Sequence, residues 1–197
     1  RSSAASDVYK RQPQGRQRHG RLVDCIQELE SEIRLLIIGR NGQSSEAPSD
    51  HIGIQVESVI LTLKRPVLVT PSQFNIPRSF LLVFDRSETG LKSVETIAQS
   101  PFLRGLRCHI LMVDQESEAA WRQVDRARNL LQDKNFSVQA AVMPGEVAVV
   151  TERYCEQERI DLLVMSSSEH SRIQNFFVGS TTSKTLRNAT IPMLFLR

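Results

Sequence analysis

Two stretches decide the fold because they repeat each other: Leu-Leu-Ile-Ile-Gly at residues 35–39 and Leu-Leu-Val-Met-Ser at residues 162–166. After each stretch come a glycine-containing loop, a helical pattern and a second apolar run that starts near a proline. The counterparts lie 126 residues apart, Gly53 with Gly179 and Pro66 with Pro192, and the first stretch is offset by 127. A repeat of this length indicates a duplicated domain, because solenoid units run roughly 20 to 50 residues.

Residues 80–197 alternate apolar runs with helical patterns. Strands are expected at 80–84, 108–113, 137–143, 162–165 and 193–196, and helices after Ser87, at 116–133, at 147–158 and at about 179–187. This alternation predicts right-handed crossovers and parallel strands. We therefore expect the α/β class: a Rossmann-like, parallel five-stranded sheet with helices on both faces, whose strand order reverses near its first strand.

Residues 22–70 carry only the rear part of the same pattern. A helix is expected at 22–31, a strand at 35–38, a loop at 39–51, a helix at 53–63 and a strand at 66–70. We interpret 22–70 as the C-terminal half of a second similar domain, 71–79 as a proline-containing linker and 80–197 as the complete domain. Residues 1–21 are expected to be a disordered, partly non-native tail, because residues 1–12 resemble translated adapter sequence.

The positive charge of the chain is concentrated in its first residues. Residues 1–21 hold six of the 25 basic residues and one of the 22 acidic residues, so 19 basic and 21 acidic residues remain for the folded part. A nucleic-acid-binding domain would instead carry a basic face. No run approaches the roughly 18 apolar residues of a membrane-spanning helix. We therefore expect neither a nucleic-acid nor a membrane partner.

Three cysteines, Cys25, Cys108 and Cys155, lie singly on apolar segments without a Cys-x-x-Cys pair. Their odd number and their spacing predict unpaired thiols in a reducing compartment, and hence a cytoplasmic protein. The four histidines show no ligand spacing, so no metal site is expected. A redox-sensing thiol is the remaining alternative, and only Cys155 qualifies, because Arg153 lies near it on a predicted helix.

Several motifs taken together indicate a family. Phe-Leu-Leu-Val-Phe-Asp at residues 80–85, Met-Pro-Gly-Glu at 143–146 and Asp-Leu-Leu-Val-Met at 161–165 precede Gly-Ser at 179–180 and Ile-Pro-Met-Leu at 191–194. In this order and spacing the motifs resemble a universal stress protein domain. The resemblance covers residues 80–197 as one domain and about 22–70 as the rear half of another. It implies a stress-response protein of the tandem-domain type.

The resemblance also implies a site for an adenine nucleotide, ATP or AMP, at the carboxyl ends of the strands. In the nucleotide-binding branch of the family, a loop of pattern Gly-x-x-Gly, nine residues, Gly and then Ser or Thr surrounds the phosphates with backbone amides. Here Ser166 and Glu169 stand at the positions of the first two glycines. The carboxylate of Glu169 would repel a phosphate by on the order of 1 kcal/mol, about fivefold in affinity, so binding is expected to be weak. The expected crevice consists of Asp85, Val113, Gly145, Ser166, Ser167, Gly179 and Ser180.

Simpler interpretations of these residues stay open. Asp85 follows a predicted strand and precedes a helix, so its carboxylate could bond backbone amides of the next turn instead of a ribose or an adenine. Gly179 could begin an ordinary helix. The first copy has the two loop glycines, Gly39 and Gly42, but no hydroxyl residue follows Gly53. Neither copy therefore holds a complete nucleotide site.

Catalysis is not expected. The serines at 166–168 and His170 suggest a nucleophile and a base, but no Gly-x-Ser-x-Gly elbow surrounds these serines. The chain also lacks the phosphate loop of P-loop enzymes and the Gly-x-Gly-x-x-Gly fingerprint of dinucleotide-binding enzymes. An ATP-hydrolysing or phosphotransfer enzyme would need a metal-binding carboxylate near the loop, a role that only Asp85 or Glu169 could fill by analogy.

A module that binds no nucleotide and serves dimerisation or protein interaction is the alternative function. The last apolar run, at 192–196, and its counterpart at 66–69 are short and lack charged residues. Such strands are suited to edge pairing. We expect them to pair one domain with the other or to form a homodimer.

Overall fold

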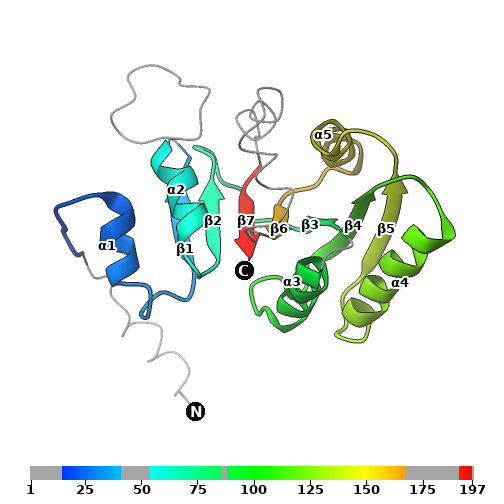
Figure 1. The fold of residues 1–197 in the computed structure, drawn as a ribbon, viewed down its shortest axis with the longest axis horizontal. Helices are drawn as coiled ribbons and strands as arrows, with labels where there is room; N and C mark the ends of the chain where they lie inside the picture. Colours follow the sequence, from blue (N-terminus) through cyan, green and yellow to red (C-terminus); the bar gives the residue numbers. More distant parts are fainter. Residues whose placement is uncertain (1–14, 41–53, 86–87, 167–190, 197) are drawn as a thin grey trace, which may run out of the picture.

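The structure is a computed structural model that describes residues 15–40, 54–85, 88–166 and 191–196. These residues form seven strands and five helices (Figure 1). In chain order they are α1 (Leu22–Glu28), β1 (Leu36–Gly39), α2 (Ile54–Thr62), β2 (Val67–Thr70), β3 (Ser79–Phe84), α3 (Glu88–Gln99), β4 (Arg107–Val113), α4 (Glu118–Gln132), β5 (Val138–Met143), α5 (Val147–Glu158), β6 (Leu163–Ser166) and β7 (Met193–Leu196).

All seven strands form one sheet in the order β1-β2-β7-β6-β3-β4-β5. Neighbouring strands are parallel except β2 and β7, which are antiparallel. Strands β3 to β7 therefore make the parallel five-stranded sheet that the sequence predicts, and the strand order reverses at β3 as expected. The α/β, Rossmann-like fold class is confirmed. The predicted helix at 179–187 lies outside the described residues.

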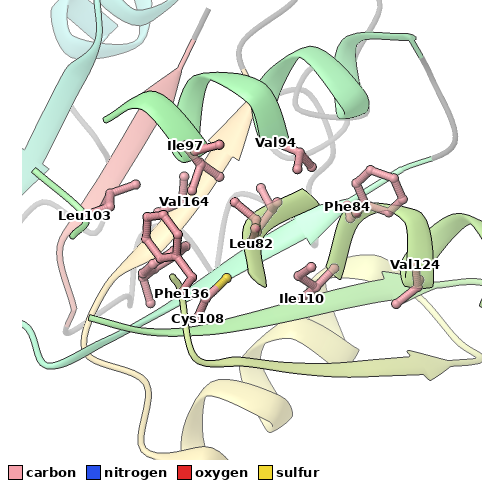
Figure 2. Close-up of a cluster of buried hydrophobic side chains, with 14 of the residues drawn as sticks. Leu82, Phe84, Val94, Ile97, Leu103, Cys108, Ile110, Val124, Phe136 and Val164 are labelled. Carbon is pink, nitrogen blue, oxygen red and sulfur yellow. The ribbon is translucent and has the colours of Figure 1, made fainter. Parts of the chain in front are cut away.

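Helices cover the sheet on both faces, with α2 and α5 on one side and α3 and α4 on the other (Figure 1). Strand β3 shows why its sequence is a continuous apolar run. Phe80, Leu82 and Phe84 pack into the core under α3 and α4, part of which Figure 2 shows, whereas Leu81 packs into the core under α5. Side chains alternate between the faces of a strand, so a strand that is covered twice needs apolar residues at every position.

The strand pairs within the repeat have the same register. Leu36 pairs with Val67 in β1 and β2, and their counterparts Leu163 and Met193 pair in β6 and β7. The backbone hydrogen bond at the start of each strand pair is also repeated. Leu36 N donates to Pro66 O over 2.9 Å, and Leu163 N donates to Pro192 O over 3.0 Å. The backbone pairing therefore follows the sequence repeat residue by residue, which supports a duplication; the proposed domain boundaries stay a prediction.

The two halves of the sheet meet where β2 and β7 pair, with Leu68 opposite Leu194. Pairing between the last strands of the two copies is thus present within one chain. Both strands also have a parallel neighbour on their other side, β1 for β2 and β6 for β7. A homodimer through the same strands stays a prediction, and it would require the pairing of β2 with β7 to open.

Candidate functional site

The candidate site lies beside β3, where the order in which strands are added to the sheet reverses. From β3 the chain proceeds to β4 and β5 on one side, and α5 then returns it to β6 on the other side of β3. Because these four strands are parallel, their carboxyl ends lie at one edge of the sheet. We call this the carboxyl edge, and it comprises the residues that follow the strands, with Asp85 after β3, Asp114 after β4, Gly145 after β5 and Ser166 at the end of β6. Open α/β sheets bind ligands in the crevice at such a point of reversal.

Asp85 is half-buried and lies against the first turn of α3. A Cβ atom added at Gly90 would be only 2.8 Å from Asp85 Oδ1, closer than side chains normally approach. Glycine at position 90 therefore lets the helix start come up to the carboxylate, and the partial positive charge of a helix N-terminus favours an anion there. This arrangement supports the simpler interpretation of Asp85 as a carboxylate at a helix start. It leaves the role of Asp85 in nucleotide binding a prediction.

Val113 and Gly145 come from neighbouring strand ends. Val113 is buried and pairs with Met143, and the next amide, Asp114 N, donates to Met143 O over 3.0 Å. Gly145 has φ +136°, and an added Cβ would be 2.8 Å from Val150 Cγ2. Only glycine accommodates both this backbone angle and this close approach. The turn thus brings the start of α5 down onto the sheet beside Val113, which packs in the same core as Val150.

The structure brings together only part of the predicted crevice. Ser166 ends β6 and pairs with Leu196, and only its backbone is described. Ser167, Gly179 and Ser180 lie outside the described residues, as does Glu169. Their predicted contacts with phosphate therefore stay predictions.

The described part of the carboxyl edge carries acidic residues. Asp85 follows β3, Asp114 follows β4, and Glu146 precedes α5 as its N-terminal flanking residue. The Asp114 carboxylate accepts a hydrogen bond from Gln115 N over 2.7 Å, whereas the side chain of Glu146 makes no capping hydrogen bond to α5. Carboxylates of this kind repel polyphosphates and therefore disfavour a highly charged anion at this edge.

Sequence reasoning missed a buried polar pair near the opposite end of β4. His109 Nδ1 lies 3.1 Å from the Tyr154 hydroxyl of α5, and both residues are buried. Burial lowers the pKa of His109, Glu158 raises it and Arg107 lowers it further. Burial also raises the pKa of Tyr154 to about 12. The one signal in the sequence is His109 itself, because it is the polar residue in the otherwise apolar run 108–113.

The environment of Cys155 disfavours the alternative of a redox-sensing thiol. Burial raises the pKa of Cys155 to about 12, and Glu152 and Glu156 raise it as well. The pKa of Cys108 is also raised to about 12 by burial. Thiolates are the reactive form, so a raised pKa disfavours reaction of these two thiols at neutral pH. The three cysteines are unpaired, as predicted.

A separate hollow of about 830 Å³ lies beside α3. Its walls are mainly apolar and include Leu35, Leu68, Leu194 and Phe102. None of the seven predicted crevice residues is among its described lining residues.

Within the described ranges, no group of three or more His, Cys, Asp or Glu is arranged to hold a metal ion. No helix in these ranges is long and apolar enough to cross a membrane.

The comparisons with known proteins agree with the sequence motifs and the fold. The sequence model of the universal stress protein family matches residues 109–197. The chain is also 32% identical over 180 residues to universal stress protein Slr1230 of Synechocystis sp.. The family model and the relative together support the universal stress protein family for this chain. The match to Slr1230 covers 90% of this chain but 63% of the relative, so the chain spans less than two thirds of that universal stress protein.

Solved universal stress proteins have the same fold. One from Archaeoglobus fulgidus DSM 4304 matches with a TM-score of 0.68 at 16% identity, over 89% of this chain and 64% of that chain. Another, crystallised in complex with cAMP, matches with a TM-score of 0.51 at 15% identity, over 62% of this chain and 98% of that chain. At these identities the likeness establishes the fold alone.

Proposed function

We propose that this protein, as a universal stress protein, binds an adenine nucleotide weakly at the carboxyl edge of residues 80–197, and that it acts by binding and association without turnover. The observation that carries the proposal is the reversal of strand order at β3, with Asp85 beside it. The solved relative with cAMP supports an adenine nucleotide as the ligand class. The unpaired cysteines support a reducing compartment, for which we propose the cytoplasm.

The charges of the carboxyl edge favour AMP over ATP. Asp85, Asp114 and Glu146 contribute negative charge, and ATP brings more negative charge to them than AMP does. Each close repulsion costs on the order of 1 kcal/mol near a protein surface. We expect AMP to bind more tightly than ATP, and the difference to shrink as added salt screens the repulsion.

Isothermal titration calorimetry with AMP and with ATP tests the proposal. Asp85→Asn should weaken AMP binding about fivefold or more, because a carboxylate that accepts a hydrogen bond from a ribose hydroxyl is lost. Asp114→Asn should leave AMP binding unchanged or tighten it, and Asp133→Asn, at the far end of α4, serves as a control. Fluorescence of Trp121 would verify that each variant is folded. The absence of heat with either nucleotide at millimolar concentration would rule out nucleotide binding.

A protein-interaction module that binds no nucleotide is the second candidate. The antiparallel pairing of β2 with β7 supports it, because the last strands of the two copies pair with each other within one chain. If calorimetry detects no nucleotide, this candidate remains.

A further inference from the structure

The outermost strand of the second copy, β5, has one side without a neighbouring strand. In the sheet that the described residues form, β5 lies at the end opposite to β1 and pairs with β4 alone (Figure 1). Cys108 N donates to Ser137 O over 2.8 Å, and Asp114 N donates to Met143 O over 3.0 Å. The odd-numbered residues of β5 therefore direct their backbone groups toward β4. The backbone N–H and C=O groups of the alternate residues face away from the sheet: Val138, Ala140 and Val142.

The free edge of β5 lacks the features that protect exposed strands. Natural edge strands are protected by charged side chains, by proline, by a bulge or by very short length. β5 has six residues, Val138–Met143, and its continuous register with β4 contains no bulge. No charged residue occurs from Asn135 to Gly145, and Pro144 follows the strand and does not interrupt it. Such an edge is a template for another strand.

The charges that flank β5 favour a second copy of this chain as the partner. Lys134 lies six residues before Ala140, Glu146 lies six residues after it, and both flanking side chains are exposed. If two β5 strands pair antiparallel around Ala140, Lys134 of one copy lies at the same end as Glu146 of the other copy. The two-fold symmetry repeats this contact at the opposite end. Parallel pairing would instead bring like charges together.

We propose that two copies of the chain associate through β5, antiparallel and in a register centred on Ala140, so that their sheets join. In this register Val138 of one copy lies opposite Val142 of the other copy, and Ala140 lies opposite its own counterpart. All three outward-facing residues of each strand then exchange backbone hydrogen bonds with outward-facing residues of the other. A shifted register would leave an outward-facing residue of each strand without such a partner.

The side chains of β5 also suit this register. Val142 is buried in the core on the side of the sheet that α4 covers, and Val138 and Ala140 are half-buried against the same core. Pairing would place the half-buried Val138 beside Val142 of the other copy, and apolar cross-strand pairs of this kind stabilise a sheet. The association is independent of nucleotide binding, and it leaves the pairing of β2 with β7 closed.

Sedimentation equilibrium of the full chain, from micromolar to millimolar concentration, tests the association. We expect a reversible equilibrium between monomer and dimer. Ala140→Pro removes an N–H donor that has no partner within the sheet, so β5 should still pair with β4. The dimer loses a hydrogen bond on each side of the symmetry axis, and association should weaken about tenfold or more. Ala140→Ser keeps the donor, so this matched control should change the affinity less than about twofold.

Reversal of the flanking charges tests the register. Lys134→Glu alone, or Glu146→Lys alone, places like charges opposite each other at both ends of the joined strands. Each single substitution should weaken association about threefold to tenfold. The double substitution restores opposite charges and should return the affinity to within about twofold of the wild type. Added salt should reduce the effect of the single substitutions, because these side chains are exposed.

Hydrogen exchange followed by nuclear magnetic resonance locates the contact. The amides of Val138, Ala140 and Val142 should exchange more slowly as the protein concentration rises. The amides of Gln139 and Ala141 face β4 already, so their exchange should depend less on concentration.

Several outcomes would overturn the proposal. The chain could remain monomeric up to millimolar concentration, or it could form a dimer that Ala140→Pro leaves unchanged. A dimer that is abolished by Ile37→Lys, on the outer strand β1, would place the interface at the other end of the sheet. Failure of the double charge reversal to restore association would refute the register. Circular dichroism checks the fold of each variant, and the charge reversals decide the matter if Ala140→Pro does not fold.

Discussion

At the scale of single residues, the buried pair of His109 and Tyr154 links the stability of the fold to pH. The two rings meet edge to face, with centroids 5.9 Å apart and an interplanar angle of 73°. His109 is 3% exposed, so its protonation would place a positive charge in a mainly apolar core. Glu158 on α5 partly compensates such a charge, and Arg107 opposes it. Burial outweighs Glu158, so the pKa of His109 falls below the ordinary value of 6.5.

This lowered pKa predicts that acid destabilises the fold. Above pH 6.5 the histidine is neutral in both the folded and the unfolded chain, and its contribution to stability is complete. As the pH falls below 6.5 the unfolded chain takes up the proton first, so the free energy of unfolding decreases until the pH reaches the lower pKa of the folded state. One histidine can contribute at most about 1.4 kcal/mol per pH unit to this slope.

Urea unfolding between pH 7.5 and 5.5 measures the effect. The slope of stability against pH should become shallower in His109→Gln, whereas His19→Gln, at an exposed position, should keep the slope of the wild type. Equal slopes in all three proteins would show that His109 does not titrate differently on folding. The comparison relies on slopes because the substitution itself also lowers stability.

At the scale of elements, one carboxylate joins the starts of two adjacent parallel strands. Asp161 Oδ2, just before β6, accepts hydrogen bonds from Arg78 N at 2.9 Å and from Ser79 N at 3.1 Å, and lies 3.1 Å from Ser79 Oγ. Asp161 N in turn donates to Ser79 Oγ over 3.3 Å. Ser79 is completely buried, so without Asp161 its polar atoms would have few other partners. These bonds hold β3 and β6 in register at the end opposite to the carboxyl edge.

Asp161→Ala should therefore lower the free energy of unfolding by about 2 to 3 kcal/mol, because buried donors lose their acceptor. Asp161→Asn should cost less, since one amide oxygen still accepts. Asp133→Ala, at the exposed C-terminal end of α4, should change stability by no more than about 0.5 kcal/mol. Chemical denaturation of the three variants provides the comparison, and a loss for Asp161→Ala no greater than for the control would contradict the role of this carboxylate.

At the scale of the whole molecule, the pairing of β2 with β7 joins the two copies through one shared core. The core on this side of the sheet runs continuously from Ile60 of α2 through Val69 of β2 to Met193 and Phe195 of β7. A two-helix, two-strand fragment buries little apolar surface by itself, so residues 22–70 depend on this contact for stability.

We expect Val69→Lys to uncouple the two parts. Val69 is buried opposite Met193, so a lysine there places a charge in the shared core. Trp121 is the only tryptophan and lies on α4, far along the chain from residues 22–70, whereas circular dichroism reports all helices. In the wild type the two signals should unfold together, and in Val69→Lys circular dichroism should change at lower denaturant than Trp121 fluorescence. Leu61→Lys, at an exposed position of α2, is the control. Separate transitions in the wild type, or coincident ones in Val69→Lys, would contradict this coupling.

Much of the fold could be predicted from the sequence because parallel strands need apolar residues on both faces. The expected strand at 108–113 and helix at 147–158 correspond to β4 (Arg107–Val113) and α5 (Val147–Glu158). The candidate site was less predictable. Asp85 and Gly145 follow strands in the sequence, but the approach of Gly90 to Asp85 depends on where α3 packs. The pairing of His109 with Tyr154 joins residues 45 positions apart, and no local pattern indicates it.

The sequence by itself indicated most of the described elements and the repeat, because both depend on periodicity and spacing along the chain, and its motifs resemble those of the universal stress protein family. Only the tertiary structure decided that β2 and β7 run antiparallel, since neither strand encodes the direction of its partner. It also decided that Val164 is buried and Ile37 exposed, although the two occupy the same position in the repeat. Burial depends on what packs across the sheet, and this is a property of neighbours in space and not of the residue itself.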